Sequence, residues 1–209
     1  MSFRDAGGQL TGFSVDVGRA LCAEMRVVCE FQPMRFAAIP EALKSGQVDF
    51  AAVSFLDTPE RRAQMVLAKP YFRSVTLWLS APGLQPGQTG TRVLVVKGSA
   101  QERFANRQGW TVVTVASHAE LVPSLAAGRV DAAMIPMMTA THVLASPTVQ
   151  ALGWVQKVMS EPELGGSASF GISPARAELK PLMDAALDRL MRNGEYDRIN
   201  SQYLPLRIY

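Results

Sequence analysis

The sequence has few of the residues from which metal centres and hydrolytic sites are built. It contains two cysteines and two histidines among 209 residues. Cys22 and Cys29 have no histidine nearby, and a structural zinc site needs four ligands. His118 and His142 fall on separate predicted helices. The motifs of serine hydrolases, zinc proteases and phosphate-binding loops do not occur. We therefore expect no metal, no cofactor and no enzymatic activity.

Long runs of one residue character are also missing. No stretch approaches the 18 apolar residues of a membrane-spanning helix. No run of Lys or Arg exceeds two residues and the net charge is only +3, so nucleic-acid binding is not expected. The opening MSFRDAGGQLTGF has no basic segment followed by an apolar one, and hence no recognisable signal peptide.

The residues that are present predict alternating helices and strands. Hydrophobic residues make up 48% of the chain, enough for a buried core. Residues 13–25 carry apolar side chains at helical spacing, and VVCEFQP (27–33) predicts a strand that ends at a proline. Further strands are expected at 48–54, 75–82 and 92–96. Thr58 followed by Pro59 predicts a helix start, and Ser99 with Glu102 predicts a capping box at the start of another helix. A C-terminal helical region begins near Ser173 and breaks at Asn193-Gly194.

An internal repeat suggests two similar halves. LKSGQVDFAAVS (43–54) and LAAGRVDAAMIP (125–136) share the pattern L-x-x-G-x-V-D-x-A. Chance similarity between two helix–strand units is the alternative explanation. We expect two α/β lobes on either side of a Gly/Pro loop near residues 83–90. Lobe one would comprise 1–80 plus 165–209, and lobe two 81–164.

Candidate binding residues follow from these strands, because ligands of such sheets bind beyond the carboxyl ends of the strands. Arg61 lies there and has the geometry to clamp a carboxylate, although a solvated surface position is the plain alternative. The helix start at Ser99 and Ala100 offers N–H groups to an anion, while Ser99 caps the helix in either case. Phe36 is either a core residue or a stacking platform.

The two cysteines allow two interpretations at this point. Cys22 is predicted late in a helix and Cys29 early in the following strand. A helix packed on its own next strand can bring such a pair within about 5.5 Å between Cα atoms, the range of a disulfide. Two separate buried thiols fit the same pattern.

From about residue 9 to 204, the ordered motifs resemble those of the periplasmic solute-binding proteins of polar amino-acid ABC transporters. GFSVDVGRALCAEM is similar to that family's opening helix, and IPEALKSGQVDFAAVSFLDTPERR to its G-x-[IV]-D segment followed by T-P-E-R. VVKGSAQERF, LAAGRVDA, SFGIS and RNGEYDRINSQYL resemble later segments. The resemblance implies a bilobed "flytrap" α/β fold joined by a hinge.

The resemblance also bears on the cysteines. The lysine/arginine/ornithine- and histidine-binding members carry L-C-x-x-M-x-V-x-C with the two cysteines bridged, and LCAEMRVVC has the same form. It therefore implies a disulfide between Cys22 and Cys29, and with it an oxidising, periplasmic location.

Three departures from the family concern the ligand. The chain begins after the family's first strand and P-x-F segment. Leu56 stands where the family has Ser or Thr, and Pro136 where it has the Asp that holds the ligand's α-ammonium. The expected ligand is therefore a more apolar, amine-free carboxylate held by Arg61. The candidate ligand-binding residues are Phe36, Ser54, Leu56, Arg61, Ser99, Ala100, Gln101 and Pro136.

The function implied is that of a monomeric protein that traps a small carboxylate-bearing solute for the membrane permease of an ABC importer. A ligand-sensing domain of a receptor and a dehydratase-like enzyme on the same fold are the alternatives. The dehydratase requires a general acid or base beside Arg61, and the sequence offers no convincing one.

Overall fold

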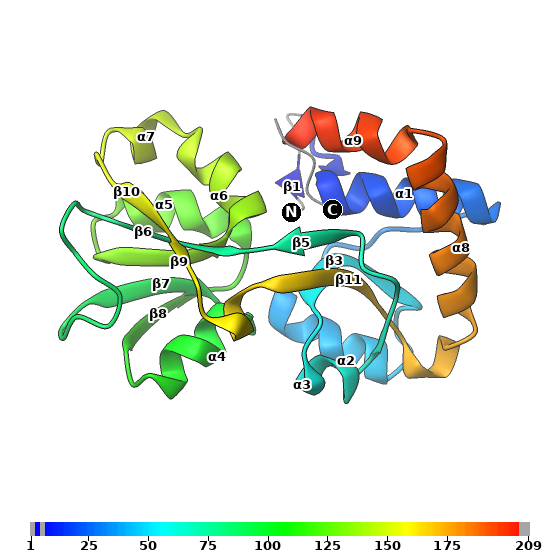
Figure 1. The fold of residues 1–209 in the computed structure, drawn as a ribbon, viewed down its shortest axis with the longest axis horizontal. Coiled ribbons are helices and arrows are strands. Elements are labelled where there is room, and N and C mark those ends of the chain that lie inside the picture. Colours follow the sequence, from blue (N-terminus) through cyan, green and yellow to red (C-terminus); the bar gives the residue numbers. More distant parts are fainter. Residues whose placement is uncertain (1–2, 5–6, 205–209) are drawn as a thin grey trace. The chain divides into compact units, whose positions relative to one another are not determined.

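The protein divides into two compact units, each with its own sheet. The structure is a computed structural model that describes residues 3–4 and 7–204, the side chains from residue 7 on. Unit 1 comprises residues 1–34, 38–73 and 167–209, and unit 2 comprises residues 35–37 and 74–166 (Figure 1). Within the described residues, no helix is long and apolar enough to cross a membrane.

Unit 1 is built around a small antiparallel sheet of order β3-β11-β4, in which β5 also pairs with β11. The sheet strands are β3 (Phe50–Leu56), β4 (Val66–Leu67), β5 (Phe72–Ser74) and β11 (Gly166–Ile172). A separate hairpin pairs β1 (Phe3–Arg4) with β2 (Leu10–Thr11). The helices are α1 (Phe13–Met25), α2 (Ile39–Lys44), α3 (Pro59–Arg62), α8 (Leu179–Arg192) and α9 (Glu195–Tyr203), with a short turn η4 (Pro174–Arg176).

Aromatic rings fill the core of unit 1 between the sheet and the long helices. The buried ring of Phe13, at the start of α1, contacts the rings of Tyr71, Phe72 and Tyr196. Tyr71 also stacks on Phe170 of β11. α1 packs against α8, α9 and β3 (Figure 1). The C-terminal helices therefore complete the core that the N-terminal helix begins.

Unit 2 has a mixed five-stranded sheet of order β10-β6-β9-β7-β8. β7 runs parallel to β8 and β9, whereas β6 is antiparallel to both β9 and β10. The strands are β6 (Thr76–Ser80), β7 (Arg92–Val96), β8 (Thr111–Val115), β9 (Ala132–Pro136) and β10 (Val155–Met159). The helices and short turns are η1 (Phe36–Ala38), α4 (Ala100–Arg107), η2 (His118–Glu120), α5 (Leu121–Ala126), α6 (Met137–Leu144), α7 (Pro147–Gln150) and η3 (Pro162–Leu164).

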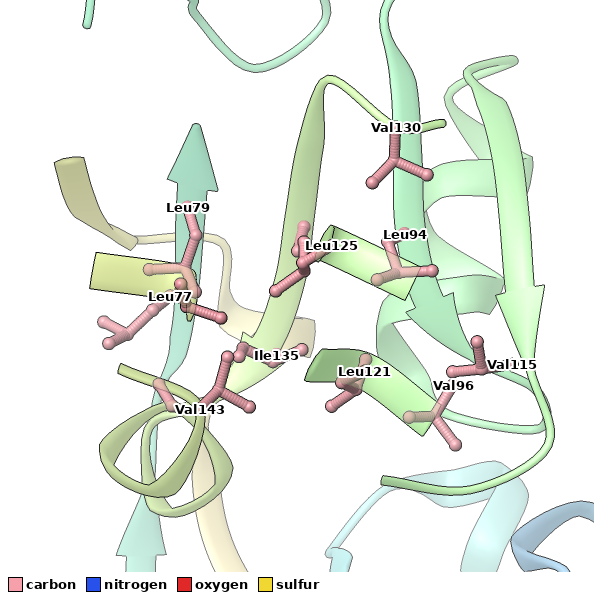
Figure 2. Close-up of a cluster of buried hydrophobic side chains, with 13 residues drawn as sticks. Leu77, Leu79, Leu94, Val96, Val115, Leu121, Leu125, Val130, Ile135 and Val143 are labelled. Atoms are coloured by element: carbon pink, nitrogen blue, oxygen red, sulfur yellow. The ribbon is translucent and has the colours of Figure 1, made fainter. Parts of the chain in front are cut away.

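Both faces of the central strands β6, β7 and β9 of the unit 2 sheet are buried, and alternate residues of each strand enter different cores. Leu77, Leu94 and Ile135 belong to a cluster that α5 and α6 complete with Leu121, Leu125 and Val143 (Figure 2). The residues between them form the second cluster with Phe104 of α4: Trp78, Val93, Val95, Ala132 and Met134. Near-continuous apolar strands such as RVLVV are the sequence signature of this arrangement.

The internal repeat has the same backbone form in both units. In each copy a helix ends at a glycine with positive φ, Gly46 at +73° and Gly128 at +64°. The aspartate that follows forms a salt bridge with an arginine: Asp49 with Arg176, and Asp131 with Arg92. Each copy then enters a strand, β3 or β9. The left-handed turn explains why both copies carry glycine.

Two expectations about the chain's course need correction. The predicted strand at 27–33 is wrong, because residues 27–35 have no regular structure and Val28 is 97% exposed. β-branched residues favoured a strand, but none of the described strands pairs with this segment. Residues 35–37 group with unit 2. β6 also lies in unit 2, paired with β9 and β10, although the sequence-based division ended lobe one at residue 80.

The two cysteines form a disulfide, as the resemblance implied. Cys22 and Cys29 are bonded with 6.2 Å between their Cα atoms. Between them α1 ends at Arg26, which adopts a left-handed conformation, and the Val27 N–H donates to the Cys22 carbonyl. The disulfide thus ties the end of α1 to the irregular segment rather than to a strand.

Removing the disulfide should destabilise the protein by about 2.5 kcal/mol, because the bond closes a loop of only seven residues. The double variant Cys22→Ala, Cys29→Ala should unfold at lower urea than the oxidised wild type. It should match wild-type protein unfolded in the presence of a reductant, and the reductant should leave the variant unchanged. Equal midpoints for oxidised and reduced wild type would contradict the prediction.

Asp131 should contribute to stability in a pH-dependent way. Hydrogen bonds from the Arg92 side chain and backbone lower the pKa of Asp131 to about 2. A lowered pKa stabilises the folded state above the unfolded pKa, and that contribution disappears as the pH falls through the folded value. Asp131→Asn should therefore lower the melting temperature slightly at pH 7, since the pair is partly exposed. The difference should shrink below about pH 4 and vanish near pH 2. A difference independent of pH would refute this assignment.

Candidate functional site

The end of β3 and the start of α3 form the candidate site of unit 1. β3 ends at Leu56, and Thr58 caps the next helix by accepting a hydrogen bond of 3.3 Å from the Arg61 N–H. Pro59 follows at the first helical position, where its fixed φ is favourable. This confirms the helix start predicted from the sequence. The tight turn brings Arg61 back beside the strand it has just left.

The neighbouring arginines of α3 have different surroundings. Arg61 is 5% exposed, and its guanidinium carbon lies 4.7 Å from the centre of the Phe55 ring. Arg62 is largely exposed and binds Asp57 through two hydrogen bonds of 2.6 and 2.8 Å. The hydrogen bond from Arg62 lowers the pKa of Asp57 and keeps it ionised. Arg61 is the buried cation, and Arg62 is the surface residue.

Ser54 belongs to a group of three hydroxyls on the other face of β3. Its Oγ lies 2.6 Å from the Tyr71 hydroxyl and 3.0 Å from Ser14 Oγ, and Tyr71 donates to Ser14 across 3.1 Å. Burial raises the pKa of Tyr71, so its hydroxyl stays protonated at physiological pH. The Ser54 hydroxyl is therefore committed to two partners inside unit 1. A ligand that bonded Ser54 would have to share it with them.

The start of α4 is the candidate anion-binding element of unit 2. Ser99 caps the helix by accepting from the Glu102 N–H at 3.1 Å, and the Glu102 carboxylate accepts from the Gly98 N–H at 2.6 Å. The Ser99 cap is therefore confirmed, whereas the reciprocal bond of the predicted capping box is not formed, because Glu102 accepts from Gly98 and the Ser99 N–H donates to the Val96 carbonyl. In the described part of the chain the N–H groups of Ala100 and Gln101 have no acceptor. Two donors are thus left at the positive end of the helix.

Gln101 and Pro136 are connected through Thr76 of β6. The buried Gln101 side chain donates to Thr76 Oγ1 at 2.7 Å, and Thr76 donates to the Leu164 carbonyl at 2.7 Å. Pro136 is the residue paired with Thr76 across the two strands. It ends β9 and precedes α6, in a position that supplies neither a charge nor an N–H.

Phe36 belongs to unit 2 with Arg35 and Ala37, although the segments before and after these three residues belong to unit 1. Its ring contacts that of His118 with 6.3 Å between centres and packs against the cluster of Figure 2. Next to it, Ala37 approaches the Gly98 turn so closely that a Cβ on Gly98 would lie 2.9 Å from the Ala37 Cα. Unit 2 therefore brings the segment of Phe36 together with the start of α4.

Several residues that shape the site escaped the sequence analysis. The sequence could have identified Phe55, which lies beneath Arg61. It follows Ser54 in the strand, and side chains alternate along a strand, so the two side chains are expected on opposite faces of β3. Ser14 and Tyr71 reach Ser54 from other elements of unit 1, and Thr76 reaches Gln101 from another strand of unit 2. Only the packing of those elements reveals these contacts. Within the described residues, no group of His, Cys, Asp and Glu is arranged to hold a metal.

Comparisons with known proteins agree with this architecture. The chain is 28% identical to the lysine/arginine/ornithine-binding periplasmic protein of Escherichia coli strain K12, over 100% of this chain and 84% of that protein. It is 27% identical to the L-arginine-binding protein of Pseudomonas aeruginosa, over 100% of this chain and 85% of that protein. The solved structure of an ancestral arginine-binding protein bound to arginine has a TM-score of 0.84 at 27% identity, covering 97% of this chain and 92% of that one.

The family assignment extends over nearly the whole sequence. The profile of the bacterial extracellular solute-binding proteins, family 3, matches residues 1–205. The two α/β units, the disulfide and the motif order agree with it. The chain belongs to the bacterial extracellular solute-binding proteins, family 3, and has their bilobed periplasmic-binding-protein fold.

Proposed function

We propose that this protein binds a small solute through the solute's carboxylate, with Arg61 as its anchor, and delivers it to the membrane permease of an ABC importer. The observation that carries the proposal is the burial of Arg61, which is 5% exposed. A guanidinium attracts a carboxylate far more strongly when it is removed from water. It can also hold both carboxylate oxygens at once. Arg62, which Asp57 already binds, is not a second anchor.

The N–H groups at the start of α4 are the second proposed donors to a carboxylate. Ala100 and Gln101 present donors at a helix N-terminus, where the helix dipole favours negative charge. Ser99 holds this end of the helix in place as its cap. In the proposal these N–H groups of unit 2 donate to a carboxylate oxygen, and Phe36, Ser54 and Leu56 are further candidate contacts of the solute.

The proposed solute lacks the α-ammonium of an amino acid. The relatives in the comparisons are named for arginine, lysine, ornithine and histidine. Here Pro136 has no charge to pair with an ammonium, and Leu56 has no hydroxyl. Asp57, the acid that follows Leu56 in the sequence, is already bound to Arg62. A buried ammonium without a carboxylate is strongly unfavourable.

The proposal includes binding but no catalysis. Asp57 is held ionised by Arg62, and its lowered pKa makes it a poor general acid. The disulfide suits an oxidising compartment, and the related proteins are named as periplasmic, which supports a periplasmic location. We propose that the protein acts there as a monomer.

Arg61→Ala should weaken carboxylate binding by about 2–5 kcal/mol, the loss expected when one partner of a buried charge pair is removed. Arg62→Ala is the matched control, because it removes the same side chain one position away. That variant should bind with nearly wild-type affinity, because Arg62 is exposed and its partner is Asp57. Calorimetric titration with succinate and benzoate measures both. Equal losses from the two variants would show that Arg61 is not the anchor.

Calorimetric titration with the twenty amino acids should show no micromolar binding, because Pro136 offers an ammonium no partner. Pro136→Asp should introduce amino-acid binding. Pro136 occupies the N-cap of α6, where aspartate is a favoured residue, so the variant should fold normally. Micromolar binding of any amino acid to the wild type, with its ammonium bonded to protein in a co-crystal, would disprove the amine-free assignment.

A further inference from the structure

The Phe55 ring, which lies beneath Arg61, is buried, as Arg61 is. Phe55 is 1% exposed and lies one residue after Ser54, so its side chain leaves the opposite face of β3. The Arg61 guanidinium carbon is 4.7 Å from the ring centre, well within the range of about 6 Å for cation–π attraction. The strand before the turn and the helix after it thus meet through this pair.

Strand β11 provides the space for the ring. Ser169 of β11 is the residue paired with Phe55 across the sheet. A Cβ built on Gly171 would lie 2.9 Å from a Phe55 ring carbon and 2.6 Å from the Met65 sulfur. Any side chain at Gly171 would therefore displace the ring or Met65. Glycine is needed at position 171 for packing, because its lack of a side chain leaves the space that the Phe55 ring occupies.

An aromatic ring differs from an acid as a partner for Arg61. A carboxylate would neutralise the guanidinium and compete with the ligand, as the pair of Asp57 with Arg62 illustrates. The face of a ring attracts a cation while carrying no net charge. The Phe55 contact therefore supports Arg61 without itself neutralising the positive charge that a ligand carboxylate requires.

We propose that Phe55 is a positioning residue for carboxylate binding: its ring face holds the Arg61 guanidinium in the orientation that receives the ligand. This inference rests on the proposed function of Arg61. It adds a requirement that the fold alone does not impose, namely that position 55 be aromatic and electron-rich. An aliphatic residue of similar size would fill the same volume without attracting the cation.

Graded fluorination tests the electrostatic part of this contact. Phe55 is replaced by 4-fluoro-, 3,5-difluoro- and 3,4,5-trifluorophenylalanine, which withdraw electron density from the ring face with little change in size. Each replacement is made in the wild type and in the Arg61→Met background. Urea unfolding of the ligand-free protein and calorimetric titration with succinate and benzoate are the two measurements.

With Arg61 present, each added fluorine should raise the unfolding constant, to a total of roughly three- to tenfold, and weaken probe binding by a similar factor. In the Arg61→Met background, which has no cation above the ring, the unfolding series should be flat. Phe55→Leu should weaken binding about tenfold or more in a protein that still unfolds cooperatively.

Three results would count against these assignments, and they are distinguishable. Parallel unfolding series in both backgrounds would overturn the cation–π contact. A graded loss of stability with unchanged probe affinity would overturn the positioning role while leaving Arg61 as the anchor. Wild-type protein that binds neither probe would contradict the proposed function, and the positioning role with it, whereas the unfolding series would still report on the contact itself.

Discussion

The proposed activity depends on keeping one cation, the guanidinium of Arg61, out of water in a fixed place. Burying a charge is unfavourable unless the surroundings compensate for its lost hydration. Here the Thr58 cap fixes the helix turn that carries Arg61, and the Phe55 ring lies against the cation. Gly171 leaves the space in which that ring sits. A helix cap, the alternation of side chains along β3 and a glycine on β11 therefore all help to position one functional group, the Arg61 guanidinium.

Much of the framework could be predicted from local sequence. The apolar spacing of residues 13–25 predicted α1, and Thr58-Pro59 predicted the start of α3, because periodicity and caps act over a few residues. The helix break at Gly194 coincides with a positive φ that glycine adopts readily. The disulfide was left undecided by spacing alone, and the family resemblance selected it.

The remaining details depend on long-range pairing, which no local pattern encodes. The three hydroxyls of Ser14, Ser54 and Tyr71 come from a helix, a strand and a loop, and they meet only when these elements pack. Residues 27–33 do not form a strand for the converse reason, since none of the described strands pairs with their β-branched residues. The candidate ligand residues stay predictions, although the surroundings of Arg61 and Arg62 already separate the two.

The most direct test of the central claim is the affinity of an Arg61→Lys variant for succinate and benzoate, compared with the wild type. Lysine keeps the positive charge but loses the planar fork and the ring stacking that distinguish arginine. If Arg61 holds the carboxylate by a fixed fork over Phe55, the variant should bind both probes at least about tenfold more weakly. Wild-type affinity in the Lys variant would contradict the account, because charge alone would then be sufficient.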